Sequence, residues 1–367
     1  MGKHGKFAVC MVAPFPPRKG GVTVQTALLT RYLEEEGVEV LRVDTNLASL
    51  RAKGLGPIRL LLQPFVILVR SLRWMPACDV VHYQAASNWA FMPVIVTTWL
   101  AKLLRKRVVI SYQGGGGPRF IDRFPWLSKP FMRIADVTTV CSTELEREFT
   151  KRNLSVVFVH NMFDDSAFVY RDRNRIEPRI VWNRSMDEIY DPLTAVRTFE
   201  IVKQRYPQAS MVMTSNGAMM NEVRRYLADH RIEGITLPGR VPLVDLVRFM
   251  NEADICLNTS IIDGLPTSML EAAACGLPIV TTPAGGIPSL FKDGESAVFF
   301  PFGGYREAAD AITELIENPT KAQSMGRTAS KVSDDYKWAR VAEELSAVYG
   351  FYLLKSKRES VSAPVPG

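Results

Sequence analysis

The chain has 367 residues, enough for about two domains that each bury a core. Hydrophobic residues make up 47% of the sequence and charged residues 23%, so a collagen, a disulfide-rich miniprotein and a disordered chain are excluded. The net charge of +7 is uneven, because residues 1–170 contain 22 Lys or Arg and 13 Asp or Glu, whereas residues 171–367 have a net charge of −2. The first half therefore either faces an anionic partner or has a basic, solvated surface.

Short apolar runs alternate with helical segments through the first half, which is typical of an α/β protein with a doubly wound parallel sheet. Strands are predicted at residues 7–13, 38–43, 80–83, 108–112 and 137–141, and helices at residues 24–36, 58–74 and 89–104. The last two helices are strongly apolar, but each is shorter than a bilayer span and contains a proline. Residues 89–104 are expected to pack between strands, whereas burial and membrane docking are both open for residues 58–74.

The same alternation starts again in the second half and predicts a second Rossmann-like domain. Strands are predicted at residues 179–182, 209–214, 235–238, 255–258, 278–282 and 298–300, and helices at residues 192–206, 219–230, 243–251 and 268–275. We expect an N-terminal domain at residues 1–168 and a C-terminal domain at residues 172–340. A terminal helix at about residues 340–355 is expected to return to the first domain, and residues 356–367 are expected to be disordered.

The five cysteines stand singly among apolar residues, without the spacing of a zinc site, and indicate reduced core positions. The N-terminus enters the first strand without the apolar region of a signal peptide. We expect a cytoplasmic protein, in peripheral contact with the inner face of the membrane through its basic half. Nucleic-acid binding is not expected, because the basic residues alternate with aliphatic runs and no RNA- or DNA-binding module is recognisable.

Ligands of doubly wound sheets bind beyond the carboxyl ends of the strands, so the loops there are the places to search. Gly20 and Gly21 precede a helix and would let backbone amides approach a phosphate, although an ordinary turn explains them equally well. Four glycines follow Gln113, and either a close backbone approach or a flexible loop would explain them. Arg184 ends the first strand of the second half and could hold an anion or form a surface salt bridge.

The loop after residue 258 contains the most informative pattern. Ser268 and Glu271 have the spacing of a capping box at the start of a short helix, and this explains Glu271 without any ligand. It does not explain Asp263 and Gly264, which put a carboxylate just before the amides of a helix N-terminus. That arrangement suits a diphosphate with attached hydroxyl groups.

These residues resemble the donor motif of the retaining GT-B glycosyltransferases of family 4, in which an acidic residue, seven residues and a Glu follow one another. Asp263, then GLPTSML, then Glu271 fit that spacing. ADICLNTS, LEAAACGLPIVTT, PAGGIPSLF and DGESAVFFP resemble successive blocks of the same family, and Asn161 stands at the family's Asn. The resemblance extends over about residues 7–350 and implies two Rossmann-like domains facing across a cleft.

The resemblance implies sugar transfer from a UDP- or GDP-sugar co-substrate, with retention of configuration and no required metal or other cofactor. Glu271 would hold the ribose hydroxyls and Asp263 the sugar hydroxyls. Arg184 and the backbone amides of the segment Gly264, Leu265, Pro266, Thr267 and Ser268 would bind the diphosphate, and Gly20 and Gly21 would close on it from the other domain. The residues near the base would be Asn216, Gly217, Gly239 and Arg240. Gln113 and Gly114 would lie on the acceptor side.

Three residues depart from the family pattern. Asp263 replaces the commoner Glu, Tyr190 stands where a Lys often follows the Arg, and Gln113 replaces the usual His. The leading hypothesis is an EC 2.4 hexosyltransferase that acts on a lipid-linked acceptor or a growing polysaccharide at the membrane. The alternatives are a non-catalytic GT-B paralogue that binds nucleotide or membrane as an assembly partner, and a nucleotide-sugar epimerase or hydrolase.

Overall fold

The computed structural model describes residues 6–16, 21–46, 58–113, 116–351 and 353. The chain divides into two compact units, the first formed by Met1–Met162 with Trp338–Gly367 and the second by Phe163–Lys337. The predicted N-terminal domain ends at residue 168, six residues after the boundary in the structure. The boundary lies earlier because Phe163 and Phe168 are buried in a core of the second unit. The tail predicted at residues 356–367 lies outside the described residues.

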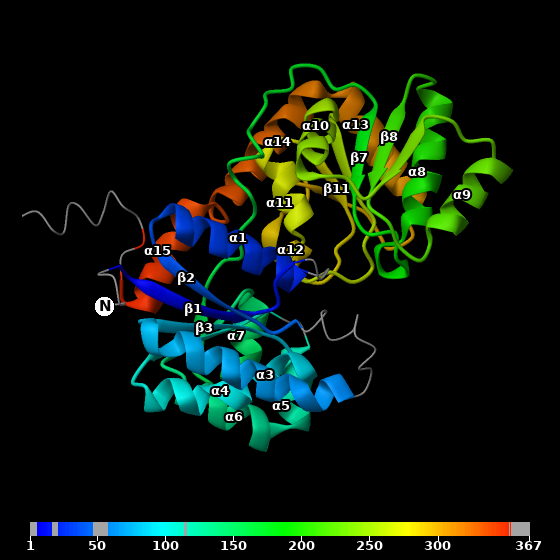
Figure 1. Cartoon of the computed structure of the whole chain (residues 1–367). Helices are drawn as coiled ribbons and strands as arrows, with labels where there is room; N and C mark the ends of the chain where they lie inside the picture. The colour runs from blue at the N-terminus through cyan, green and yellow to red at the C-terminus, as the bar shows by residue number, and fades with distance from the viewer. Residues whose placement is uncertain (1–5, 17–20, 47–57, 114–115, 352, 354–367) are drawn as a thin grey trace, which may run out of the picture. The chain divides into compact units, whose positions relative to one another are not determined.

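The first unit contains a parallel six-stranded sheet in the order β2-β1-β3-β4-β5-β6, with helices on both faces (Figure 1). Its strands are β1 Ala8–Ala13, β2 Glu39–Asp44, β3 Val80–Ala85, β4 Arg107–Tyr112, β5 Val137–Val140 and β6 Val157–Phe158. Its helices are α1 Gly21–Glu35, α3 Ile58–Trp74, η1 Met75–Ala77, η2 Asn88–Phe91, α4 Met92–Leu103, α5 Gly117–Arg123, α6 Pro125–Ile134, α7 Thr143–Thr150 and α15 Trp338–Tyr349.

The second unit contains another parallel six-stranded sheet, in the order β12-β11-β10-β7-β8-β9. Its strands are β7 Arg179–Asn183, β8 Ser210–Thr214, β9 Ile235–Gly239, β10 Ile255–Asn258, β11 Ile279–Thr281 and β12 Val298–Phe299. Its helices are η3 Glu188–Tyr190, α8 Pro192–Arg205, α9 Met220–Asp229, α10 Leu243–Glu252, α11 Thr267–Ala274, α12 Ile287–Leu290, α13 Tyr305–Glu317 and α14 Pro319–Asp334. The predicted α/β class, with two doubly wound sheets, is confirmed.

The strand β1 shows why these sheets are covered on both faces. All six of its residues are buried, and they alternate between two separate cores. Cys10 and its neighbours at period two pack with residues of α3 and α4, whereas Met11 and its neighbours pack with α1 and α15. Among the described residues, no helix is both long and apolar enough to cross a membrane.

The terminal helix α15, predicted from its apolar spacing, packs on the first unit. Trp338 stacks on Tyr32 of α1 with ring centroids 4.9 Å apart, and Leu345 is buried in the same core. Two polar contacts also anchor the helix, because Glu344 binds His160 Nδ1 at 2.8 Å and Arg107 Nε donates to the Val348 carbonyl at 2.8 Å. The chain therefore returns to complete the core of the unit in which it began.

Replacing Leu345 by Ala is expected to lower the free energy of unfolding of the first unit by about 2–5 kcal/mol, because it leaves a cavity beneath α15. Urea unfolding followed by circular dichroism measures the change. Glu343→Ala, an exposed position of the same helix, is the matched control and should change the free energy by less than about 0.5 kcal/mol. Equal stability of the Leu345→Ala and wild-type proteins would contradict this role of α15.

Candidate functional site

Arg184 lies at the centre of a polar cluster at the carboxyl end of β7. Its Nη1 donates to the Ser268 hydroxyl at 2.7 Å, and its Nη2 forms an ion pair with the carboxylate of Asp263. The Arg184 side chain is only 11% exposed and that of Asp263 only 8%. The structure thus brings together three of the residues predicted to bind a donor, from positions that are far apart in the sequence.

The order of the strands explains why these residues meet. Arg184 follows β7 and Asp263 follows β10, which are neighbours at the point where the order of the second sheet reverses. In doubly wound sheets the loops diverge at such a point and leave a crevice beyond the strand ends. The amides of Thr267 and Ser268 lie in the first turn of α11, where amides have no carbonyl partner within the helix.

Two glycines hold the Asp263 loop from behind. A Cβ on Gly285 would lie 1.7 Å from the Asp263 carbonyl oxygen, and one on Gly286 would lie 2.2 Å from that of Gly264. The Gly286 amide also donates to the Asp263 carbonyl at 3.3 Å. Sequence reasoning placed this Gly pair in a family block without giving it a role, and only the packing shows that it supports the loop.

The predicted capping box at Ser268 and Glu271 is wrong. The helix α11 begins one residue earlier, at Thr267, with Pro266 as its N-cap and no side-chain cap. Ser268 therefore lies inside the first turn, where its hydroxyl binds Arg184, and Glu271 accepts a hydrogen bond from Asn183 Nδ2 at 3.2 Å. Glu271 is thus bound to the last residue of β7, and capping does not account for its presence.

Burial determines the electrostatics of both carboxyl groups. It raises the pKa of Glu271 to about 8, and the nearby charge of Asp164 acts in the same direction while Arg184 opposes it. Burial also raises the pKa of Asp263, against the lowering effects of Arg184, the Ser260 hydroxyl and the Gly264 amide. Arg184 is thus paired with the Asp263 carboxylate and lies near Glu271, a second carboxyl group that can be neutral. An anionic ligand can take the place of Asp263 beside Arg184, and a proton on Glu271 limits the negative charge that then accumulates.

Tyr190, which stands where the related family often has a Lys, packs against Arg184. The Arg184 guanidinium carbon lies 4.3 Å from the centre of the Tyr190 ring, in a cation–π contact. The turn that carries Tyr190 is fixed by the Ile261 amide, which donates to the Ile189 carbonyl at 2.8 Å, and by the Thr259 hydroxyl, which donates to the Tyr190 carbonyl at 2.8 Å. The aromatic ring thus restricts the orientation of Arg184 without adding a charge.

The residues predicted near the base adjoin the segment that follows Arg184. The carbonyl of Asn216 accepts hydrogen bonds from the Met186 amide at 3.2 Å and the Ser185 hydroxyl at 2.9 Å. Gly217 packs so tightly that a Cβ would lie 2.2 Å from the Met186 carbonyl oxygen. Gly239 has φ +74° and adjoins the Asn216 side chain, and Arg240 after it is exposed. Their predicted role in binding a base stays a prediction.

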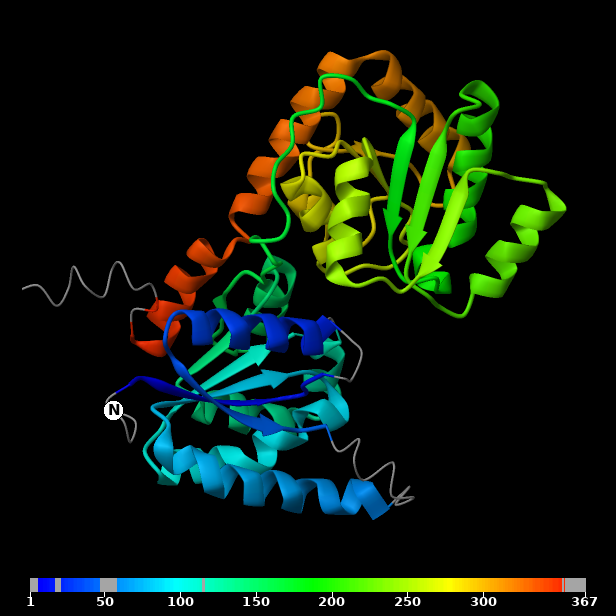
Figure 2. The same ribbon diagram turned by 45° about the horizontal axis from the view of Figure 1, so that its top comes forward.

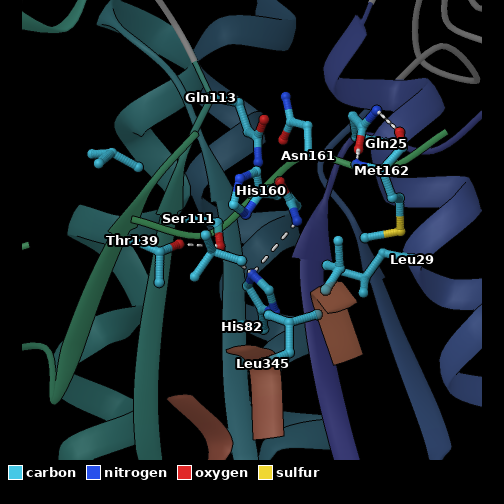
Figure 3. Close-up of a pocket in the computed structure, with 14 residues that line it drawn as sticks. Gln25, Leu29, His82, Ser111, Gln113, Thr139, His160, Asn161, Met162 and Leu345 are labelled. Carbon is cyan, nitrogen blue, oxygen red and sulfur yellow. Dashed lines mark hydrogen bonds between the residues drawn. The ribbon is translucent and has the colours of Figure 1, made fainter. Parts of the chain in front are cut away.

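A second polar cluster lies in the first unit and surrounds a small pocket of about 20 Å³, which has room for an ordered water molecule (Figure 3). Gln113, predicted on the acceptor side, lines it together with Gln25 of α1, His160, Asn161 and residues of β3 to β5. The predicted Gly20 and Gly114 lie outside the described residues. Gly21 begins α1 with open space around its Cβ position.

The pocket has a mixed polar and apolar lining, and one of its polar residues, His160, is paired with the Glu344 carboxylate at 2.8 Å. His82 of β3 is completely buried, which lowers its pKa to about 3, so the ring is neutral. Its Nδ1 lies 2.5 Å from the Tyr349 hydroxyl of α15 and its Nε2 lies 2.7 Å from the Ser111 hydroxyl, which in turn lies 2.7 Å from that of Thr139. Sequence reasoning did not identify His82, although a His within an apolar strand was a visible signal.

One glycine of the loop after Gln113 makes the predicted close backbone approach, and it approaches the hydrophobic core of the first unit. A Cβ on Gly117 would lie 2.7 Å from the Phe149 ring and 2.8 Å from the Tyr112 ring. Gly117 therefore packs against buried aromatic rings, and no ligand is needed to explain it. Among the described residues, no group of three or more His, Cys, Asp or Glu side chains is arranged to hold a metal ion.

Comparison with known proteins matches a stretch of the second unit to a family of glycosyl transferases. Residues 187–332 match the family model of "Glycosyl transferases group 1", and this stretch includes Asp263 and Glu271. Residues 187–332, within the second unit, are therefore similar to this family. The matched stretch begins just after Arg184 and so does not include it. The roles of Arg184, Asp263 and Glu271 are taken up under the proposed function.

Relatives and solved structures extend the likeness to the whole chain. The D-inositol 3-phosphate glycosyltransferase of Paenarthrobacter aurescens is 26% identical over 189 residues, which are 50% of this chain and 44% of the relative. The sulfoquinovosyl transferase SQD2 of Arabidopsis thaliana is 23% identical, over 91% of this chain and 72% of the relative. The crystal structure of Anabaena Alr3699/HepE in complex with UDP has a TM-score of 0.67 at 14% identity, covering 94% of this chain and 99% of that one. The chain thus has the GT-B fold, while its match spans less than half of the first of these relatives.

Because the pKa of Glu271 in the folded protein, about 8, exceeds the ordinary value of 4.5, its ionisation opposes folding. The stability contributed by its neutral form is complete below about pH 4.5 and is lost as the pH rises towards 8. Glu271→Gln, which keeps the shape without the charge, should therefore gain stability relative to the wild type between pH 5 and pH 8.5, by more than about 1.4 kcal/mol, the equivalent of one pKa unit. Urea unfolding at the two pH values measures it, and a pH-independent difference would contradict the raised pKa.

Proposed function

We propose that the protein transfers a sugar from a nucleoside diphosphate sugar to an acceptor hydroxyl, with retention of configuration. The observation that carries the proposal is the Arg184 guanidinium, held between Asp263 and Ser268 beside the first turn of α11. A guanidinium and free amides are the groups that bind a diphosphate and stabilise the charge that grows on it as it leaves. The match to the group 1 family model and the UDP bound to the structurally similar Anabaena protein support such a donor.

The proposed roles combine the resemblance to family 4 with the positions of the side chains. A diphosphate would replace Asp263 as the partner of Arg184, which would free the Asp263 carboxylate to accept hydrogen bonds from sugar hydroxyls. Glu271, below the end of β7, would accept hydrogen bonds from the ribose. Retention is supported by the Asp263 and Glu271 spacing shared with retaining family 4 enzymes, and we propose that Arg184 and the amides compensate the phosphate charge without a required metal ion.

We propose a lipid-linked acceptor or a growing polysaccharide, and a cytoplasmic site of action at the inner face of the membrane. The pocket with Gln113, His82 and Asn161 supports a hydroxyl group as the acceptor, because amide side chains and a neutral imidazole can exchange hydrogen bonds with it. The membrane part rests on the basic charge and apolar helices of the first unit. The non-catalytic alternative loses support from the group 1 match, which covers the predicted donor loop.

Thermal unfolding of the protein with UDP, GDP and ADP, and then with their common sugars, tests the donor site. A ligand at 100 times its dissociation constant adds about 2.7 kcal/mol to the folded state, so one base should raise Tm by several degrees. Arg184→Ala should abolish that shift and Glu271→Ala should abolish sugar transfer from a radiolabelled donor to a membrane extract. Arg224→Ala, on the exposed side of α9, is the control that keeps both. Full transfer by Glu271→Ala, or no shift with any nucleotide in folded protein, would refute the donor assignment.

Tyr190 offers a sharper test, because its ring and its hydroxyl can be separated. Tyr190→Leu removes the cation–π contact with Arg184, worth about 0.5–2 kcal/mol, and should weaken binding of the preferred nucleoside diphosphate by about 2-fold to 30-fold. Tyr190→Phe keeps the ring and should bind within about 2-fold of the wild type. Titration calorimetry measures both affinities, and equal weakening in the two variants would mean that the hydroxyl, and not the ring, matters.

A further inference from the structure

Three helices of the first unit form one continuous outer surface. The helices α3, α4 and α6 cover the same face of the first sheet, and α4 contacts both of the others (Figure 2). Their inner sides supply Ile67, Val94 and Met132 to the core beneath. Their outer sides are covered by nothing within the described part of this unit, so their composition shows what they can contact.

The outer side of these helices exposes large apolar side chains, two of which are tryptophans. Phe65 of α3 is 65% exposed, Trp99 and Leu103 of α4 are 62% and 80% exposed, and Trp126 of α6 is 72% exposed. Leu62, Val69 and Leu72 extend the stripe along α3. Single exposed apolar residues are ordinary, but a set on three contacting helices marks an interaction surface.

The charge of the same helices has one sign. Their sequences contain six Lys or Arg and no Asp or Glu. Residues 58–136 contain 11 basic and three acidic residues, a net charge of +8. Asp136 pairs with Lys102 of α4 at 2.9 Å and neutralises that one cation. The other two acids are also engaged, since Asp79 accepts from the Ala8 amide at 2.9 Å and Asp122 pairs with Arg152 at 2.7 Å.

We propose that α3, α4 and α6 together form the surface by which the protein docks on an anionic lipid leaflet, an inference that rests on the proposed transfer to an acceptor at the membrane. Tryptophan rings favour the level of the lipid headgroups, and a basic surface gains about 1 kcal/mol for each Lys or Arg near anionic lipids. A second copy of the chain fits this surface poorly, because it would bring two cationic faces together.

The structure also corrects which residues of α3 can meet lipid. Arg70, within the segment for which burial and membrane docking were both open, is half-buried and donates through Nη1 to the Asp44 carbonyl at 2.5 Å. Arg73 is exposed and lies over the Trp74 ring, 4.9 Å from its centre. The helix at Met92–Leu103, expected only to pack between strands, contributes Trp99 and Leu103 to the surface.

Co-sedimentation of the full chain with vesicles tests the proposal. The wild type should bind vesicles of phosphatidylcholine with 30% phosphatidylglycerol and release them at 0.5 M NaCl, and it should bind pure phosphatidylcholine weakly. The triple variant Phe65→Ser, Trp99→Ser and Leu103→Ser should lose at least 10-fold in affinity. The matched control is Val244→Ser with Phe302→Ser, two exposed apolar residues of the second unit.

A charge variant separates the electrostatic part. Arg73→Glu with Arg133→Glu should reduce binding to the anionic vesicles at least 10-fold, whereas Arg224→Glu with Arg225→Glu makes the same charge change on α9 and should have little effect. Equal losses in these two variants would show a response to net charge alone and would overturn the assignment of the surface.

Tryptophan fluorescence locates the contact directly. Vesicles should shift the emission of the wild type to shorter wavelength, and Trp99→Phe with Trp126→Phe should remove most of the shift because these two rings are exposed. Unchanged binding by the triple variant, or a wild-type dimer that this variant dissociates, would overturn the proposal. Nucleotide-induced Tm shifts in the same variants should stay normal, so that failure of docking is distinguished from failure of the donor site.

Discussion

Arg184 and Asp263 follow adjacent parallel strands of the second unit and form an ion pair with little exposure to solvent. A buried pair of this kind adds little net stability, but removing one partner leaves an uncompensated charge and is costly. The pair therefore holds the two loops in register until another anion takes the place of the carboxylate. Three further groups surround the Arg184 guanidinium: the Ser268 hydroxyl at the start of α11, the Tyr190 ring and the Glu271 carboxyl group.

Backbone packing keeps the pair in place. Gly285 and Gly286 let one turn lie directly against the carbonyls of the Asp263 loop, where any side chain would collide. The turn with Ile189 binds the other side of the same loop through a backbone hydrogen bond. A site that must change ion partners gains from such a rigid frame, because only side chains then need to move.

The two units contain different chemistry. The second unit has a charged site at the reversal point of its sheet, and the first has a pocket in which His82 is neutral, together with an outer surface that is apolar and basic. This division agrees with the proposed function, in which the second unit holds a charged leaving group and the first meets an acceptor hydroxyl and a lipid surface. The helix α15 ties the end of the chain to the first unit and makes that unit's core continuous.

The sequence determined the order and type of most elements, because apolar periodicity is a local property. It predicted the alternation of strands and helices, the apolar helix α3 and a terminal helix near α15, and short patterns made Arg184, Asp263 and Glu271 candidates for the site. It did not predict α13 or α14, although α13 has a clear apolar periodicity. Only the tertiary structure decided that Glu271 faces Asn183 and does not cap its helix, that Tyr190 stacks on Arg184, and that α3, α4 and α6 share one exposed surface. These depend on contacts between residues distant in sequence, and no local pattern encodes which of several compatible partners a side chain will meet.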